Sequence, residues 1–174
     1  MASSAASDAL SPGGRRVIVT GAEGGIGRAT VATLKRAGCA VAGCDAGDFD
    51  VRDRAAVEAG VAALVDRLGG CDAVVACAGV VDTIHRAERF SEDQWRKDID
   101  TNLTGTFHVV RALFEPLRAS GDGRVVVLSS ASAESGLPGQ VAYTASKAGL
   151  VGMVRTLAAE WGATASASTS SCPA

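Results

Sequence analysis

The chain has 174 residues, of which 47% are hydrophobic and 21% are charged, a size and apolar fraction that predict one domain with a buried core. Its 17 basic and 19 acidic residues give a net charge of −2, which argues against a nucleic-acid partner and against binding to an anionic membrane surface. The longest apolar runs are too short to span a bilayer.

The first residues and the cysteines indicate the compartment. Residues 1–14 lack the basic and apolar segments of a secretory signal, so they are predicted to form a disordered leader. The 5 cysteines are scattered and contain no C-x-x-C pair: Cys39, Cys44, Cys71, Cys77 and Cys172. We therefore expect no disulfide framework, no zinc or other metal site, and a cytoplasmic location. Cys39, Cys44 and Cys77 are expected to be small core hydrophobes.

Predicted strands and helices alternate along the chain. Short β-branched or apolar runs predict strands at Arg16–Thr20, Ala40–Cys44, Asp72–Ala76 and Arg124–Ser129. Apolar residues at helical spacing predict helices at Gly25–Ala37, Arg54–Leu68, Ser91–Ser120 and Ala142–Trp161. This alternation predicts an α/β fold with a parallel sheet covered on both faces. One connection is too short for a crossover helix, so Ala46–Arg52 is predicted to be a loop or a short edge strand.

A glycine-rich turn, Gly21-Ala-Glu-Gly-Gly-Ile-Gly27, joins the first predicted strand to the first helix. Glycine permits the tight turn and the close approach of a pyrophosphate, to which the helix start offers free N–H groups. This context favours a dinucleotide site over a plain turn. Asp45 directly follows the second predicted strand, where a carboxylate accepts hydrogen bonds from ribose hydroxyls and repels a 2′-phosphate. NAD is therefore expected rather than NADP, and a turn-starting aspartate is the alternative.

Tyr143 and Lys147 are spaced i and i+4, which places them on one face of the last predicted helix. An ammonium beside a phenol stabilises the phenolate, the form that acts as a base. Ser130 ends the preceding strand at the carboxyl edge of the sheet, where open α/β sheets bind ligands. Tyr-x-x-x-Lys alone is equally typical of a solvated surface pair, so the interpretation depends on the combination.

The glycine-rich turn, Asn102, Ser130, Tyr143 and Lys147, in this order, resemble the classical type of the short-chain dehydrogenase/reductase family, over about residues 16–162. The resemblance implies a Rossmann-like doubly wound parallel sheet and an NAD(H)-dependent oxidoreductase that interconverts an alcohol and a ketone. It implies that Tyr143 is the acid/base and that Lys147 assists it and holds the nicotinamide ribose. Ser130 would orient the substrate, and Asn102 would anchor a water of the proton relay.

The resemblance also implies the cofactor contacts, which are Gly21, Gly25, Ile26, Gly27, Asp45, Asp50, Val51, Ala78, Gly79, Tyr143 and Lys147. Two features depart from the family pattern. The usual Asn-Ala-Gly appears as Cys77-Ala78-Gly79, which removes an amide that stabilises a strand. The short connection after Asp45 is similar to that of members that lack a helix there.

The end of the chain departs further. Residues 163–174 have low complexity and no apolar period, so they are predicted to be a disordered tail that forms no strand. The family has a core strand and a Pro-Gly here, so we expect an incomplete domain over residues 15–162 that misses its last strands and helices. Read one base out of frame with GC-rich codons, the tail translates as R-H-G-V-R-V-N-V-L-V-P-G. We hypothesise a frameshifted or mis-sequenced product of a longer enzyme.

Three functions stay open: an alcohol/ketone oxidoreductase, a catalytically inactive nucleotide-binding fragment, and a 3-oxoacyl-thioester reductase. The expected partner is a small-molecule alcohol or ketone, with no nucleic acid and no membrane. The family usually associates through the helices predicted at 91–120 and 142–161, so a homodimer or homotetramer is expected. His85 and His108 are isolated and are expected to be surface or satisfied side chains rather than metal ligands.

Overall fold

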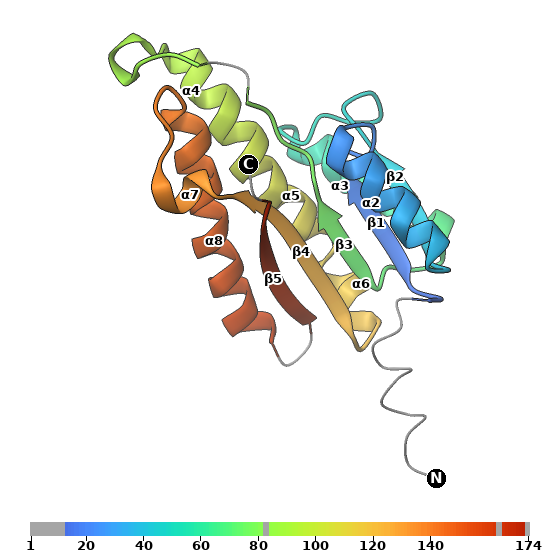
Figure 1. The fold of residues 1–174 in the computed structure, drawn as a ribbon. Coiled ribbons are helices and arrows are strands. Elements are labelled where there is room, and N and C mark those ends of the chain that lie inside the picture. The colour runs from blue at the N-terminus through green and yellow to red at the C-terminus, as the bar shows by residue number, and fades with distance from the viewer. Residues whose placement is uncertain (1–12, 82–83, 163–164, 173–174) are drawn as a thin grey trace.

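The computed structural model describes residues 13–81, 84–162 and 165–172, the last of these by their backbone. The predicted leader therefore falls almost wholly outside the described residues. The strands form one parallel sheet of 5 strands in the order β2-β1-β3-β4-β5 (Figure 1). They are β1 (Arg16–Thr20), β2 (Ala40–Cys44), β3 (Ala73–Ala76), β4 (Gly123–Ser130) and β5 (Ala165–Cys172).

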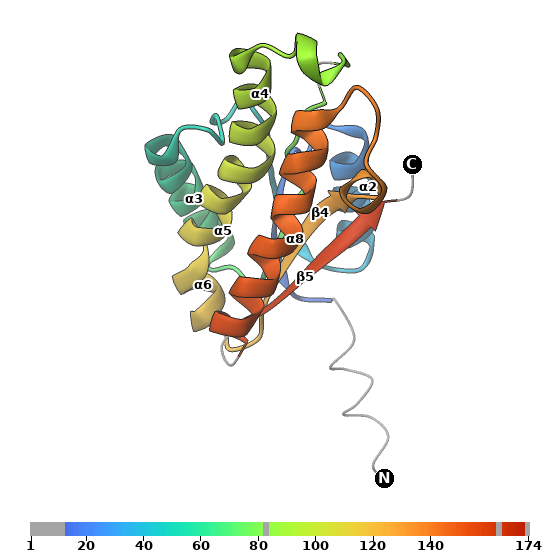
Figure 2. The same ribbon diagram turned by 90° about the vertical axis from the view of Figure 1, so that its left-hand side faces the viewer.

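Helices cover the sheet on both faces. One face carries α3, α4, α5, α6 and α8, while α2 packs on the other face beside β1 and β2 (Figures 1 and 2). The helices are α2 (Gly25–Arg36), α3 (Arg54–Leu68), α4 (Glu92–Ile99), α5 (Gly105–Ala112), α6 (Phe114–Ala119), α7 (Ser132–Ser135) and α8 (Val141–Trp161). A 3₁₀ turn, η1, spans Ala87–Arg89. The predicted α/β fold with a doubly covered parallel sheet is confirmed.

Local signals in the sequence account for several helix ends. The carboxylate of Asp53 accepts hydrogen bonds from the backbone N–H groups of Ala55 and Ala56, which starts α3. Gly69, at a φ of 70°, ends the same helix in the left-handed conformation. The side chains of Ser91 and Gln94 form a capping box at the start of α4.

The single helix predicted over residues 91–120 is divided in the structure. A π-helical segment, η2 (Asp100–Thr104), separates α4 from α5, and Leu113 separates α5 from α6. A π-helical turn inserts one residue into the helical path, so side chains beyond it change direction. This irregularity lies at Asn102, a predicted site residue.

The core has two layers that correspond to the two faces of the sheet. The larger layer lies between the sheet and α3, α5 and α8, and it includes Ile18, Val74 and Val127. The smaller layer lies beneath α2 and includes Val17 and Val19. Alternate residues of β1 thus point into different layers, as expected for a strand buried on both faces.

The α2 face of β4 is different. Val126 lies opposite Val75 of β3, so it points toward the α2 side of the sheet. Val126 and Leu128 are only partly buried, and neither belongs to the two core layers. Among the described residues, α2 packs on β1 and β2, and this part of β4 is less protected from solvent.

The prediction of a disordered tail is wrong for Ala165–Cys172. The backbone of these residues forms β5, which pairs with β4 along the whole of Gly123–Ser130. A parallel ladder is made from backbone N–H and C=O groups, which the edge of β4 supplies for any residue except proline. A low-complexity side-chain pattern therefore does not exclude a strand. Residues 163–164 and 173–174 lie outside the described residues.

The connection from β2 to α3 confirms the predicted loop. Residues 45–53 form turns that are closed by hydrogen bonds from Asp48 N to Asp45 O and from Asp53 N to Asp50 O. No strand or helix is present in this segment. In the part of the chain that the structure describes, no helix is both long enough and apolar enough to cross a membrane.

Candidate active site

The glycine-rich turn packs closely against the loop that follows β3. Gly21 has a φ of +64°, and a Cβ there would lie 2.7 Å from Ala78 N. A Cβ at Gly27 would lie 2.0 Å from Gly21 O, so the helix start also requires glycine. These contacts explain two predicted glycines by packing within the protein, before any ligand is considered.

Gly25 and Gly24 have a different role. A Cβ at Gly25 would meet nothing within 4 Å, so protein packing does not require glycine there. Gly24 is the N-cap of α2, and the first turn has neither a side-chain cap nor an acidic residue. An uncapped helix start with open space before it suits a bound anion such as a pyrophosphate. Ile26, which follows, is 50% exposed beside this space.

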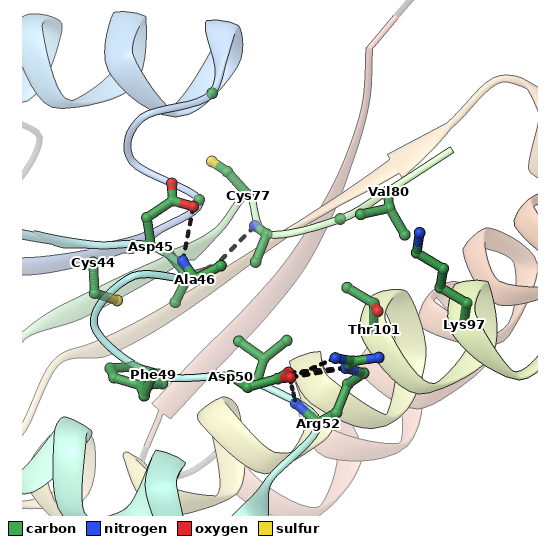
Figure 3. A pocket seen from close by; sticks show the side chains of 16 residues that line it. Cys44, Asp45, Ala46, Phe49, Asp50, Arg52, Cys77, Val80, Lys97 and Thr101 are labelled. Carbon is green, nitrogen blue, oxygen red and sulfur yellow. Dashed lines mark hydrogen bonds and ion pairs between the residues drawn. The ribbon is translucent and has the colours of Figure 1, made fainter. Parts of the chain in front are cut away.

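A cavity of about 320 Å³ opens beside the glycine-rich turn (Figure 3). The ends of β1, β2 and β3, the 45–53 loop and α4 surround it. Predicted cofactor residues in its lining are Gly21, Asp45, Asp50, Val51, Ala78 and Gly79. Its further lining residues are Thr20, Gly24, Cys44, Ala46, Phe49, Arg52, Cys77, Val80, Lys97 and Thr101. Gly25, Ile26, Gly27, Tyr143 and Lys147 lie outside this lining.

The carboxylate of Asp45 is fixed at the end of β2. Its Oδ2 accepts a hydrogen bond of 2.9 Å from Glu23 N, and its Oδ1 accepts one of 2.8 Å from Ala46 N. A bond of 3.1 Å from Ala22 N to Cys44 O joins the same strand end to the glycine-rich turn. Asp45 is therefore more than the start of a turn: it is held at the cavity wall next to the glycines (Figure 3).

Asp50 and Arg52 form a second polar pair in the cavity wall. Arg52 Nη2 lies 2.6 Å from Asp50 Oδ2, and Arg52 N donates a bond of 2.9 Å to Asp50 Oδ1. The hydrogen bond from the Arg52 side chain holds the pKa of Asp50 below its ordinary value. Arg52 was not among the predicted site residues, because the sequence does not show that its side chain faces the cavity that holds Asp45 (Figure 3).

Three other lining residues were also missed. Lys97 and Thr101 lie one helical turn apart on α4 and η2 and reach the cavity from the helix layer. Phe49 closes the bottom of the cavity beneath Cys44 (Figure 3). The four-residue spacing of Lys97 and Thr101 indicates that α4 presents one face to the cavity. The sequence alone does not show which loop lies opposite that face.

The cysteine predictions hold in part. Cys39 and Cys44 are buried in the core, as expected. Cys77 is only half-buried and lines the cavity, so its prediction as a core hydrophobe is a partial error. Burial raises the pKa of the Cys77 thiol. Cys77 directly follows β3, so it lines the cavity while its side chain also forms a hydrogen bond with Thr30 of α2.

Asn102 is fully buried in the π-helical segment and joins two parts of the site. Its Oδ1 accepts a bond of 2.7 Å from Val80 N, and its Nδ2 donates bonds of 2.8 Å to Val80 O and 3.1 Å to Ser146 Oγ. The amide thereby ties the loop after β3 to α8. Because Ser146 Oγ donates a bond of 2.6 Å to Tyr143 O, the network extends to the turn that carries Tyr143.

Lys147 is the buried cation of the site. It is 7% exposed, and its Nζ donates a bond of 3.0 Å to Leu128 O. The same nitrogen lies 5.7 Å from the centroid of the Tyr143 ring. Burial lowers the pKa of the Lys147 ammonium below its ordinary value. A Cβ at Gly79 would lie 3.4 Å from Lys147 Nζ, so the lysine reaches the rim of the cavity.

Ser130 stands at the end of β4, half-exposed. Its Oγ accepts a bond of 3.2 Å from Ser132 N and one of 3.0 Å from Ser132 Oγ. Next to it, Ser129 Oγ donates a bond of 2.9 Å to Lys147 O, which fastens β4 to α8. Consequently β4 and α8 present Ser130, Tyr143 and Lys147 at the carboxyl edge of the sheet, as the sequence predicts.

Exposed apolar side chains border the same edge. Two loops meet there, because His85 N donates a bond of 3.0 Å to Gly139 O. The large exposed hydrophobic residues in these loops and at the start of α8 are Val81, Ile84, Leu137 and Val141. Clusters of this kind on a folded protein mark ligand or partner sites. We call these four side chains the apolar rim.

Known proteins share this fold and sequence. The sequence model described as short chain dehydrogenase matches residues 44–173. An acetoacetyl-CoA reductase of Rhizobium meliloti is 34% identical, over 91% of this chain and 73% of the relative. A D-threitol dehydrogenase of Mycolicibacterium smegmatis is 34% identical, over 86% of this chain and 65% of the relative. The chain thus spans about two thirds to three quarters of the length of these relatives.

Solved structures agree. An NAD⁺-bound xylitol dehydrogenase superimposes with a TM-score of 0.87 at 25% identity, covering 92% of this chain and 70% of the other. A carveol dehydrogenase from Mycobacterium avium in complex with NAD gives a TM-score of 0.82 at 27% identity, covering 86% and 66%. From its sequence and its fold, this chain belongs to the short-chain dehydrogenase family.

Proposed function

We propose that this chain is an NAD(H)-dependent oxidoreductase that interconverts an alcohol and a ketone. The observation that carries the proposal is the position of Lys147. Its buried Nζ lies 5.7 Å from the Tyr143 ring and next to Gly79, which lines the cavity beside the glycine-rich turn. A dinucleotide cavity and a phenol–ammonium pair therefore meet at one edge of the sheet, as hydride transfer coupled to proton transfer requires.

The residues of the cavity fit a dinucleotide. The uncapped start of α2 and the open space at Gly25 suit the pyrophosphate. The fixed Asp45 carboxylate suits two ribose hydroxyls and disfavours a 2′-phosphate, which supports NAD over NADP. Asp50 and Val51 would flank the adenine, with Ala78 and Gly79 on the adenosine side. When bound, NAD supplies the hydride chemistry, which no amino-acid side chain provides.

The chain's own residues would handle the proton. Tyr143 would accept the proton of the substrate hydroxyl in the oxidation direction, and Ser130 would hold that oxygen. The nearby Lys147 would favour the phenolate by its positive charge. Asn102 would keep the loop after β3 and the Tyr143 turn in place through its three side-chain bonds. In this proposal Asn102 acts by positioning, in addition to the predicted anchoring of a water.

The apolar rim favours a substrate with an apolar group beside the reacting carbon. Its side chains belong to the loop after β3 and to the segment between Ser130 and Tyr143, so such a group would cover them. The second candidate is a 3-oxoacyl-thioester reductase. The similarity to an acetoacetyl-CoA reductase at 34% identity favours it, and a 3-oxoacyl chain also presents an apolar group.

Substitution of Tyr143 by phenylalanine tests the proposal. The wild-type chain should oxidise NADH with a ketone or a 3-oxoacyl thioester, followed by absorbance. Tyr143→Phe should lower kcat by about 10²- to 10⁴-fold, the contribution of a general acid or base, while NADH still binds. Thr144→Val, at the next position of the helix, is the matched control and should keep its activity.

Two outcomes would contradict the proposal. Equal turnover by the wild type and Tyr143→Phe would remove Tyr143 from the chemistry. NADH binding with no turnover of any alcohol, ketone or thioester by the wild type would support the alternative of an inactive nucleotide-binding fragment.

A further inference from the structure

His108 of α5 contacts the loop that forms one wall of the cavity. Its Nδ1 lies 3.0 Å from Val51 O, and the side chain is half-buried. A backbone carbonyl only accepts hydrogen bonds, so the ring nitrogen must carry the proton. Both the Nδ1–H tautomer and the imidazolium meet this condition. His108 was expected to be a surface or satisfied histidine, and the carbonyl of Val51 is the group that satisfies it.

The loop itself has mostly internal bonds. Asp48 N donates to Asp45 O, Arg52 N donates to Asp50 Oδ1, and Asp53 N donates to Asp50 O. Such bonds determine the local shape of the loop, but they do not fix its position relative to the sheet. The position matters because Asp50, Val51 and Arg52 all line the cavity.

Helix α5 supplies contacts from outside the loop. A Cβ at Gly105 would lie 2.6 Å from Val51 Cγ2, so the helix backbone packs directly on the Val51 side chain. His108 follows three residues later on the same helical face and binds the carbonyl of the same residue. One helix thereby holds Val51 both at its side chain and at its backbone.

We propose that His108 is a positioning residue for the cofactor, which holds the 50–53 segment at the distance from α5 that an adenosine group requires. This inference rests on the proposed function, because it presumes that the cavity binds NADH. His108 does not touch the cavity itself: it is absent from the lining, and it acts through Val51.

Two substitutions separate the hydrogen bond from the volume of the ring. His108→Leu fills similar space without a donor, and His108→Asn keeps an N–H group near the position of Nδ1. NADH binding to the full chain, followed by fluorescence, should weaken about 3- to 10-fold in His108→Leu, as loss of one hydrogen bond predicts. In His108→Asn it should stay within about 2-fold of the wild type.

The second histidine provides a matched control. His85 lies in the apolar-rim loop, away from the lining of the cavity, so His85→Leu should leave NADH affinity unchanged. Equal affinities for the wild type and His108→Leu would overturn the inference. Equal weakening in His108→Leu and His108→Asn would also overturn it, because the effect would then come from packing.

Hydrogen exchange gives a readout that does not depend on NADH. Backbone amides of residues 46–53 should exchange faster in His108→Leu than in the wild type or in His108→Asn. Unchanged exchange in His108→Leu would contradict the positioning role. A wild-type chain that binds no NADH would contradict the proposed function, while exchange in the loop would still decide the role of His108.

Discussion

The two halves of the sheet differ in how completely side chains support them. Around β1, β2 and β3, apolar residues fill both layers, and helices cover both faces. Around β4 and β5, α8 covers one face, while Val126 and Leu128 on the other face belong to neither core layer. The cofactor cavity lies mainly in the first half, and the Ser130, Tyr143 and Lys147 set lies in the second.

Because of this difference, cofactor binding and the proposed proton transfer depend on different kinds of contact. The cofactor half depends on contacts between backbones, such as Gly21 against Ala78, which leave little freedom. The half that carries the proposed catalytic residues depends on side-chain bonds from α8 to β4 and η2, made by Ser129, Lys147 and Asn102. We therefore expect cofactor binding to tolerate changes in the second half better than turnover does.

The largest effect should follow from a methyl group at Gly27. Gly27→Ala would place Cβ 2.0 Å from Gly21 O, so the turn must move, and NADH binding should be lost along with about 3 kcal/mol of stability. Gly25→Ala is the matched control for folding, because its Cβ meets nothing within 4 Å. It should keep the unfolding midpoint yet weaken NADH binding, since the methyl group enters the pyrophosphate space. Normal binding by Gly27→Ala in calorimetry would contradict this account.

The next largest effect concerns β5. A chain whose residues after Gly162 follow the shifted reading frame would carry valines and a leucine in this strand. Burial of these side chains against α8 and β4 should raise the free energy of unfolding by about 2 kcal/mol in urea titrations. A scrambled tail of the same Ala, Ser and Thr content is the control and should change nothing. Codons around Gly162 that are incompatible with the shifted frame would refute the underlying hypothesis.

Substitutions of two adjacent residues of β4, which point to opposite faces of the sheet, compare how strongly each face contributes to stability. Val127 is 0% exposed within the larger core layer, so Val127→Ala should cost about 2 kcal/mol of unfolding free energy. Leu128 is partly buried outside both layers, so Leu128→Ala should cost less than about 1 kcal/mol, although it removes more atoms. Urea unfolding of both variants measures the difference. A larger cost at Leu128 would show that the α2 face of β4 is covered.

The smallest effect is electrostatic and lies in the cofactor half. Arg16 binds Asp72 through Nη2 at 2.5 Å and through its backbone N at 2.7 Å, and the side-chain hydrogen bond lowers the pKa of Asp72. The pair is partly exposed, so solvent screening limits the loss in Asp72→Asn to about 1 kcal/mol at neutral pH.

The sign of the pH dependence follows from the lowered pKa of Asp72. The stabilisation is fully present above the ordinary carboxyl pKa of about 4 and is lost as the pH falls through the lowered folded value. Wild type and Asp72→Asn should therefore converge in stability below about pH 3. A difference that stays constant down to acidic pH would show that the ion pair is not its source.

Periodicity predicted the regular part of this fold. β1, β2 and α3 begin and end at the predicted residues, because their apolar patterns and the Asp53 and Gly69 signals are local. The π-helical turn at Asn102 was not predicted, because a single inserted residue does not visibly change the spacing of apolar residues along the helix. β5 was wrongly excluded, because pairing depends on the free edge of β4 as well as on side chains.

The positions of the site residues could be predicted where the sequence matches several motifs of the family. The structure places Ser130 at the end of β4, Tyr143 and Lys147 on α8, and Asp45 in the cavity wall, while the roles predicted for these residues stay proposals. Lys97 and the contact of His108 with Val51 were missed because each joins segments far apart in the sequence, and Arg52 was missed because the loop pattern does not show which side chains face the cavity. The assembly expected through the helices at 91–120 and 142–161 stays a prediction.

The most direct test of the central claim is the binding of NADH and NADPH to the 174-residue chain, followed by fluorescence in parallel titrations. The account predicts saturable binding with tighter affinity for NADH, and a preference that shrinks in Asp45→Ala because the ribose-binding carboxylate is gone. A folded chain that binds neither dinucleotide, or that prefers NADPH while Asp45 is intact, would contradict it.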